Sequence, residues 1–184
     1  MLTRSSTALI SDSEQHVVAE LTQYRLRCKR FTKTEMKTQK TPDRRVYRDN
    51  TFAFFLEIKE IKHDPWLDGL RHDPIFNRLT DDIHTAVKQF DSVNPNLEHP
   101  NVLALVNNDH MCGSLDLVGV LTGHLLLEGG GTAPIYSNYS QGRIRHERQR
   151  IHLYLWFDAF KADKLLFGDK QHRDRLCTYF GVDP

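Results

Sequence analysis

The fold is decided by residues 51–61, which read TFAFFLEIKEI. Aromatic and branched apolar side chains dominate this stretch, as they do in β-strands, so we expect a central strand of a sheet. Two charged residues, Glu57 and Lys59, interrupt it. Side chains two positions apart in a strand point to the same face, so the two should be neighbours. Burying them is costly unless they pair or bind something.

The segments around this strand predict an α/β sandwich, with helices covering a mixed sheet. Before it, the turn pair Asp49-Asn50 and an extended piece over residues 44–48 predict a hairpin, with Asp43 near its start. The spacing of Val17, Leu21, Tyr24 and Cys28 predicts a helix over residues 12–30, and Ser11 with Glu14 has the spacing of a capping box. Further along the chain we expect helices over 75–90 and 115–122, strands over 102–106 and 151–157, and a helical or irregular tail from 158.

Length and composition favour one globular domain of 184 residues. We expect a loose arm over residues 1–10, a core over 11–107 and a C-terminal extension of the same domain over 108–184. Hydrophobic residues make up 39% and charged residues 27%, which excludes a wholly disordered chain. Three widely spaced cysteines and the absence of a signal-like or membrane-spanning stretch predict a cytoplasmic protein with reduced thiols and no membrane contact.

Basic residues are concentrated in two places, although the net charge is only +1. Residues 25–48 hold ten lysines and arginines against two acidic residues, and Arg143, Arg145, Arg148 and Arg150 form a second cluster. Such clusters are typical of phosphate contacts, which makes Arg44, Arg45, Arg48, Arg143 and Arg145 candidate nucleic-acid ligands. The alternative is a solvated charged face.

Asp43, Glu57 and Lys59 form the candidate catalytic set. Two carboxylates that converge at a strand end can hold a hard cation such as Mg²⁺. A neighbouring lysine can neutralise charge that builds on a phosphate, so the set suits metal-assisted hydrolysis of a phosphodiester. The structural alternative is a cross-strand salt bridge without catalytic function.

The run Pro42-Asp43 … Glu57-Ile58-Lys59 resembles the signature of the PD-(D/E)xK, or restriction-endonuclease-like, nucleases. The resemblance covers residues 12–107 and implies a mixed sheet flanked by helices, in the order helix, three antiparallel strands, helix, strand. It implies that Asp43, Glu57 and the backbone carbonyl of Ile58 bind Mg²⁺ or Mn²⁺, and that Lys59 is the catalytic lysine. Two further site residues that it implies are Glu20 and Gln89. Arg44-Arg45 departs from the apolar strand usual in the family, which leaves Asp49 as an alternative to Asp43.

Other patterns are weaker. The ten histidines lack the spacing of a zinc pair, and Gly129-Gly130-Gly131 lacks the lysine of a P-loop. The sequence therefore predicts a magnesium-dependent endonuclease, a hydrolase with DNA as the expected substrate, and leaves a homo-oligomer open. The alternative function is a nucleic-acid-binding or scaffold protein that keeps the nuclease-like fold without cutting.

Overall fold

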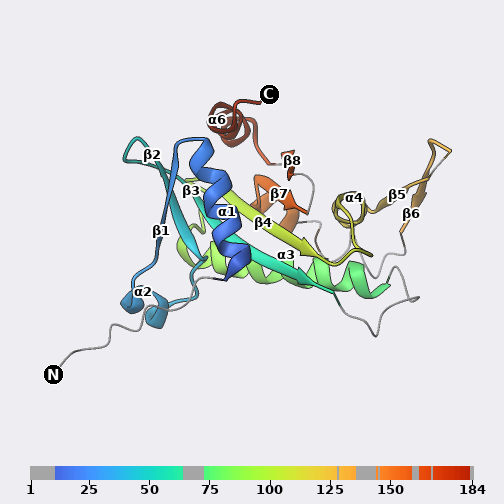
Figure 1. The fold of residues 1–184 in the computed structure, drawn as a ribbon, viewed down its shortest axis with the longest axis horizontal. Coiled ribbons are helices and arrows are strands. Elements are labelled where there is room, and N and C mark those ends of the chain that lie inside the picture. Colours follow the sequence, from blue (N-terminus) through green and yellow to red (C-terminus); the bar gives the residue numbers. More distant parts are fainter. Residues whose placement is uncertain are drawn as a thin grey trace.

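The computed structural model describes residues 11–63, 73–127, 129–135, 144, 146–158, 162–166 and 168–182. The described helices and strands alternate along the chain (Figure 1). In chain order they are α1 Asp12–Gln23, β1 Leu26–Arg30, α2 Lys33–Thr38, β2 Arg44–Arg48, β3 Thr51–Lys62, α3 Asp73–Val93, β4 Asn101–Asn108, α4 Ser114–Thr122, β5 His124–Leu126, β6 Thr132–Pro134, the 3₁₀ turn η2 Glu147–Arg150, β7 Leu153–Phe157, β8 Ala162–Leu166 and α6 Lys170–Phe180.

Six strands form one mixed sheet in the order β1-β2-β3-β4-β7-β8. The pairs β1–β2 and β2–β3 are antiparallel, β3–β4 and β4–β7 are parallel, and β8 closes the far edge antiparallel to β7. The strands predicted over 51–61, 102–106 and 151–157 are therefore neighbours in the centre of one sheet, which confirms their assignment from apolar composition. A separate hairpin joins β5 and β6.

Each face of the sheet carries its own apolar cluster. One face packs against α1 and α6 through Val17, Leu21 and Leu176, and the other packs against α3 and α4 through residues such as Leu79 and Leu117. In Figure 1, α1 crosses in front of the strands and α3 runs behind them. Coverage of both faces accounts for the continuous apolar run of β4, whose residues 101–106 are all buried.

A bulge in β3 sets which side chains face α3. The register with β2 pairs Val46 with Phe54 but Tyr47 with Phe52, so Ala53 is the extra residue. Phe52 and Phe55 consequently lie on the α3 side, whereas Phe54 packs against α1 and α6. Glu57 and Lys59 follow Phe55 at two-residue intervals, and the pleat keeps them on the α3 side.

The helix predicted over residues 12–30 is wrong in its second half. The helix ends at Gln23, Arg25 has a left-handed backbone (φ 59°), and Leu26–Arg30 is strand β1 paired with β2. The helical spacing of Cys28 was coincidental, because a strand residue separated from the helix by a turn can fall on any multiple of the helical period. The chain after 158 is also more regular than predicted, since it supplies β8 and α6.

Some predictions fall outside the described residues, namely the arm over residues 1–10 and the side chains of Arg143 and Arg145. The segment after residue 107 supplies β7 and β8 to the sheet that the segment before it begins. Within the described part of the chain, none of the helices combines the length and apolar composition needed to cross a bilayer.

Candidate active site

Asp43 and Glu57 lie opposite each other on neighbouring strands. Asp43 immediately precedes Arg44, which is paired with Leu56, so the antiparallel register brings Asp43 across from Glu57. The Asp43 backbone N–H donates to Glu57 Oε2 at 3.0 Å, and the Ile58 backbone N–H donates to Asp43 Oδ2 at 2.8 Å. These two hydrogen bonds fix both carboxylates on the hairpin, and they favour Asp43 over Asp49, which sits in the turn at the other end of β2.

Lys59 and Gln89 complete the cluster on the α3 side of the sheet. Lys59 Nζ lies 2.7 Å from Glu57 Oε1 and donates to Gln89 Oε1 at 3.4 Å. The Gln89 amide in turn donates to the carbonyl oxygen of Thr41 at 3.1 Å. Gln89 therefore ties the helix α3, the segment before β2 and the lysine of β3 together. The structure brings four of the five predicted catalytic residues into one cluster.

Burial raises the pKa values of both carboxylates. Only 2% of the Glu57 side chain is exposed, and burial together with the charge of Asp43 raises its pKa to about 7, against the opposing effect of Lys59. Burial also raises the pKa of Asp43, although the Ile58 amide lowers it in part. Two close carboxylates in a poorly solvated site have more negative charge than Lys59 alone offsets. A divalent cation would supply the missing positive charge.

The donor set fits such a cation. Asp43 and Glu57 offer carboxylate oxygens and the Ile58 carbonyl offers a backbone oxygen, which are the hard ligands that Mg²⁺ prefers. Asp82 on α3 adds a nearby acidic group that the sequence analysis missed: burial raises its pKa to about 6, while the charge of Lys59 lowers it. Asp82 lies about two turns before Gln89 on α3, and only the predicted position of Gln89 could have drawn attention to it.

Glu14, rather than Glu20, is the acidic residue of α1 that influences the site. Its carboxylate accepts hydrogen bonds from Arg30 and, at 2.6 Å, from Arg44, and its charge contributes to the raised pKa of Asp43. Glu20 is half-buried on α1 and enters none of the described hydrogen bonds of the Asp43–Glu57 pair. The sequence suggested only a capping function for Glu14. Ser11 does accept a hydrogen bond from the Glu14 backbone N–H, but the Glu14 carboxylate pairs with arginines of β1 and β2.

The arginines of β2 differ in their surroundings. Arg44 is only 6% exposed and forms an ion pair with Glu14, so burial removes its guanidinium from the surface on which a phosphate could bind. Arg45 pairs with Glu35 at 2.6 Å and lies over the Phe31 ring at 3.9 Å. Arg48 donates to the carbonyl of Thr178 on α6 at 2.9 Å. These contacts make Arg44 a structural residue, contrary to its predicted role in nucleic-acid binding.

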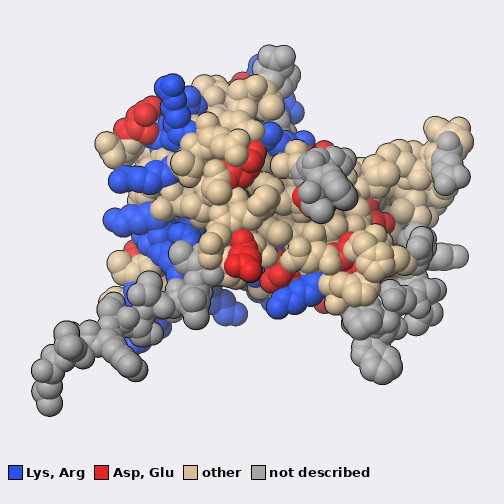
Figure 2. Space-filling view, viewed as in Figure 1, with Lys and Arg blue, Asp and Glu red and all other residues tan. Residues whose placement is uncertain are grey.

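The basic surface instead belongs mainly to β1 and α2. Figure 2 shows lysines and arginines gathered at the side where β1, β2 and α2 lie in Figure 1. Exposed side chains in this region are Arg25, Arg27, Lys29, Lys33, Lys37 and Lys40. We call these six residues the basic edge.

Two histidine groups form that the sequence spacing did not predict, because their members come from distant segments. His63, Asp109 and His110 form one, and His152, Asp169 and His172 form the other. In the second group the Asn101 backbone N–H donates to His152 Nδ1 at 3.0 Å. A neutral His152 ring then carries its proton on Nε2, which faces Asp169 at 3.6 Å, so it offers no lone pair to a metal there.

Comparisons with protein-family models, curated proteins and solved structures found no match to this chain, so the geometry of the cluster carries the functional argument.

Proposed function

We propose that the chain is a metal-dependent nuclease of the PD-(D/E)xK type that hydrolyses phosphodiester bonds, with DNA as substrate. The observation that carries the proposal is the convergence of Asp43, Glu57, Lys59 and Gln89 from three separate segments on one face of the sheet. Strand geometry alone makes Glu57 and Lys59 neighbours, but it does not bring Gln89 of α3 to Lys59, so the contact with Gln89 is the part of the cluster that a chance D…ExK pattern does not explain.

The order of elements supports the same family. Helix α1 is followed by three antiparallel strands, β1 to β3, and then by α3 and β4, with the short α2 inserted between β1 and β2. This is the order that the resemblance implied. The strand β1, where residue spacing predicts a helix, supplies the first of the three antiparallel strands.

In the proposed mechanism Asp43, Glu57 and the Ile58 carbonyl hold Mg²⁺ or Mn²⁺. The ion, when bound, polarises the phosphate and lowers the pKa of the attacking water. Lys59 presents its ammonium beside the carboxylates, where it can stabilise the negative charge that develops on the phosphate. Gln89 accepts from Lys59 and donates to Thr41, and so holds the lysine in position.

One observation favours the alternative, a nucleic-acid-binding protein that does not cut. Glu57 is almost fully buried and its Oε1 is already paired with Lys59, as in a structural salt bridge. The two functions differ in one measurable property. A nuclease needs Lys59 for turnover, whereas a binding protein needs it only for stability.

The deciding experiment measures cleavage of single- and double-stranded DNA and RNA in Mg²⁺ or Mn²⁺, with wild type, Lys59→Met and Lys62→Met. The strand offers this matched control because it repeats the triplet as Glu60-Ile61-Lys62, with Lys62 Nζ 3.8 Å from Glu60 and largely exposed. The proposal expects cleavage by wild type and Lys62→Met, and a loss of at least about 100-fold in Lys59→Met. Absence of cleavage by wild type with every substrate and metal would refute it.

A further inference from the structure

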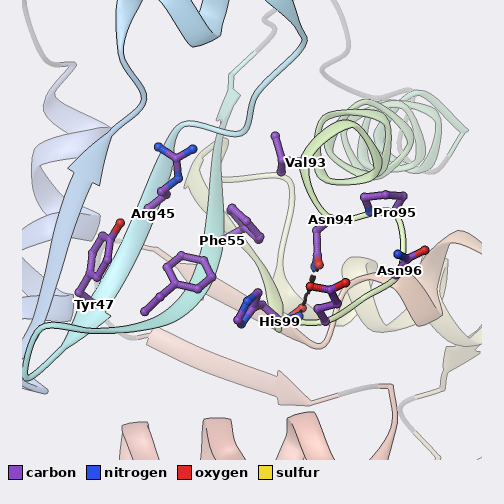
Figure 3. A pocket seen from close by; sticks show the side chains of 10 residues that line it. Arg45, Tyr47, Phe55, Val93, Asn94, Pro95, Asn96 and His99 are labelled. Atoms are coloured by element: carbon purple, nitrogen blue, oxygen red, sulfur yellow. Dashed lines mark hydrogen bonds between the residues drawn. The ribbon is translucent and has the colours of Figure 1, made fainter.

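A pocket of about 450 Å³ opens beside the candidate active site, on the same side of the sheet as α3 (Figure 3). Strands β2 and β3 contribute Arg45, Tyr47, Phe52 and Phe55, and the loop after α3 contributes His99. Asn94 shapes this loop by donating to the His99 carbonyl at 2.7 Å and to Asn101 Oδ1 at 2.9 Å. The volume lies within the range of roughly 300–1,000 Å³ typical of small-molecule sites.

The strand register connects the pocket to the carboxylates. Arg45 lies two residues after Asp43, Phe55 lies two residues before Glu57, and Arg45 pairs with Phe55 across the sheet. Two residues of strand span about 7 Å. A group held in the pocket therefore lies about two strand residues from the carboxylates, so a phosphate next to it can reach the site.

The pocket walls are aromatic and set at steep angles to one another. The ring centroid of Phe52 lies 4.8 Å from that of Phe55 and 4.6 Å from that of His99, with interplanar angles of 60° and 87°. Tyr47 lies 5.6 Å from Phe52 at 72°. Among the described residues, His99 Nδ1 is a buried atom with no hydrogen-bond partner. The pocket thus offers aromatic walls against which a planar ring can pack.

Positive charge leads from the edge of the sheet to these rings. The register aligns Lys29, Arg45 and Phe55 in one row across β1, β2 and β3, and Arg27, Tyr47 and Phe52 in the next. Arg27 and Lys29 are exposed members of the basic edge. Aromatic side chains next to a basic strip are the features by which proteins bind single-stranded nucleic acid, through base stacking and phosphate contacts.

We propose that this pocket binds one unpaired nucleobase of a single-stranded nucleic acid, with the flanking phosphates on β1. The inference rests on the proposed function, because it names the form of substrate that the Asp43–Glu57 site would receive. A base inside a duplex is paired and stacked and could enter the pocket only after extrusion, at an energetic cost. Single strands, or single-stranded ends and gaps, are therefore the preferred substrate.

The test measures binding by fluorescence anisotropy in EDTA, where no cleavage occurs. The ligands are labelled twelve-nucleotide DNA and RNA single strands, the corresponding DNA duplex, and a DNA strand with abasic sites at alternate positions. Tyr47→Leu removes one wall of the pocket. Its matched control is Tyr179→Leu on the opposite face, since each tyrosine has one arginine near its ring, at 5.8 Å for Tyr47 and 5.6 Å for Tyr179.

The inference expects single strands to bind more tightly than the duplex. It expects abasic sites and Tyr47→Leu each to weaken binding by about tenfold or more, and Tyr179→Leu to leave it unchanged. If the melting curve shows that Tyr47→Leu does not fold, the test is the affinity of the wild-type protein for the abasic strand compared with the intact strand. Equal affinity for abasic and intact strands overturns the inference.

The binding results and the cleavage results are independent. Selective binding of single strands by a protein that never cuts would support the base pocket and refute the nuclease. Equal cleavage rates for intact and abasic strands, together with faster cleavage of duplex than of single strands, would support the nuclease and refute the base pocket.

Discussion

The carboxylates of Asp43 and Glu57 each accept a backbone hydrogen bond from the other's strand. The Asp43 N–H donates to Glu57 Oε2 at 3.0 Å, and the N–H of Ile58, the residue after Glu57, donates to Asp43 Oδ2 at 2.8 Å. The carboxylates that the proposed mechanism uses to bind metal are therefore also acceptors that close the hairpin. Removing either side chain affects folding as well as chemistry. Substitutions that keep an acceptor oxygen are needed to separate the two effects.

We expect Asp43→Asn and Glu57→Gln each to reduce the cleavage rate by at least about 100-fold. Both should change the free energy of unfolding by no more than about 1 kcal/mol. The amides keep one oxygen for the backbone donors but bind a divalent cation poorly. Asp43→Ala and Glu57→Ala should instead cost about 1–3 kcal/mol, because each leaves a backbone N–H without its acceptor. Urea unfolding and cleavage assays on the same preparations measure both effects. Amide variants that still cut at the wild-type rate would exclude these carboxylates from catalysis.

Gln89→Leu should lower kcat by about 10- to 100-fold with little change in KM. The amide contacts Lys59 and the carbonyl of Thr41, so its loss releases the lysine from its position without touching the basic edge. Gln89→Glu serves as the conservative variant, because a carboxylate can still accept from Lys59 but cannot donate to Thr41. Partial recovery in Gln89→Glu is expected. Equal kinetics in wild type and Gln89→Leu would leave Gln89 without a positioning role.

Binding to nucleic acid should weaken as salt rises, and Arg27→Glu or Lys29→Glu should reduce the slope of log affinity against log salt by about one unit each. Both side chains are exposed on β1, beside the row that leads to the pocket. Lys62→Glu is the matched control, since Lys62 is an exposed lysine on β3 outside the basic edge. Titrations at four salt concentrations give the slopes. If the slope of log affinity against log salt is the same in wild type and all three variants, the basic edge does not contact phosphates and is only a solvated charged face.

Arg44→Met should reduce stability by about 3 kcal/mol, because it leaves the largely buried Glu14 carboxylate with only the half-exposed Arg30 as partner. The double variant with Glu14→Gln should recover part of this loss, with a coupling of about 0.5–3 kcal/mol. Urea unfolding of the four proteins completes the cycle. Additive losses would mean that the ion pair between α1 and β2 contributes nothing specific.

The sequence correctly predicted the segments whose composition is typical of one kind of secondary structure. Residues 51–61 and 102–106 are rich in aromatic or branched apolar side chains, which favours inner strands, and the turn at Asp49-Asn50 closes the hairpin that carries Asp43. The bulge at Ala53, which was not predicted, shifts the register so that Asp43 lies across from Glu57. The prediction from sequence was wrong where the same residue spacing is compatible with both a helix and a strand. The spacing of Cys28 suited a helix, but a left-handed Arg25 starts a strand instead.

The candidate site shows the same division. Asp43, Glu57 and Lys59 lie close together because of local strand geometry, which a sequence motif can encode. Asp82, Glu14 and the buried histidine pair depend on how helices pack across the sheet, and nothing in their local sequence specifies that packing. The pocket beside the site was missed for the same reason. Its walls come from β2, β3 and the loop that follows α3, which are separate segments of the chain.

His152 should make the protein less stable in mild acid. The ring is fully buried, and burial together with the neighbouring His172 lowers its pKa from 6.5 to about 4. Between these values the unfolded chain binds a proton that the folded protein excludes, so protons favour unfolding. The contribution of this group is complete above about pH 6.5 and falls as the pH drops towards 4, by roughly 3 kcal/mol in all.

The raised pKa values of Glu57 and Asp82 act in the opposite direction, so the effect must be isolated as a difference between wild type and His152→Asn. Asparagine keeps an acceptor for the Asn101 N–H but does not titrate. The stability advantage of wild type over His152→Asn, measured by urea unfolding, should shrink by roughly 3 kcal/mol between pH 7.5 and pH 4. An advantage that stays constant over this range would mean that the buried ring accepts a proton as readily as the unfolded chain does.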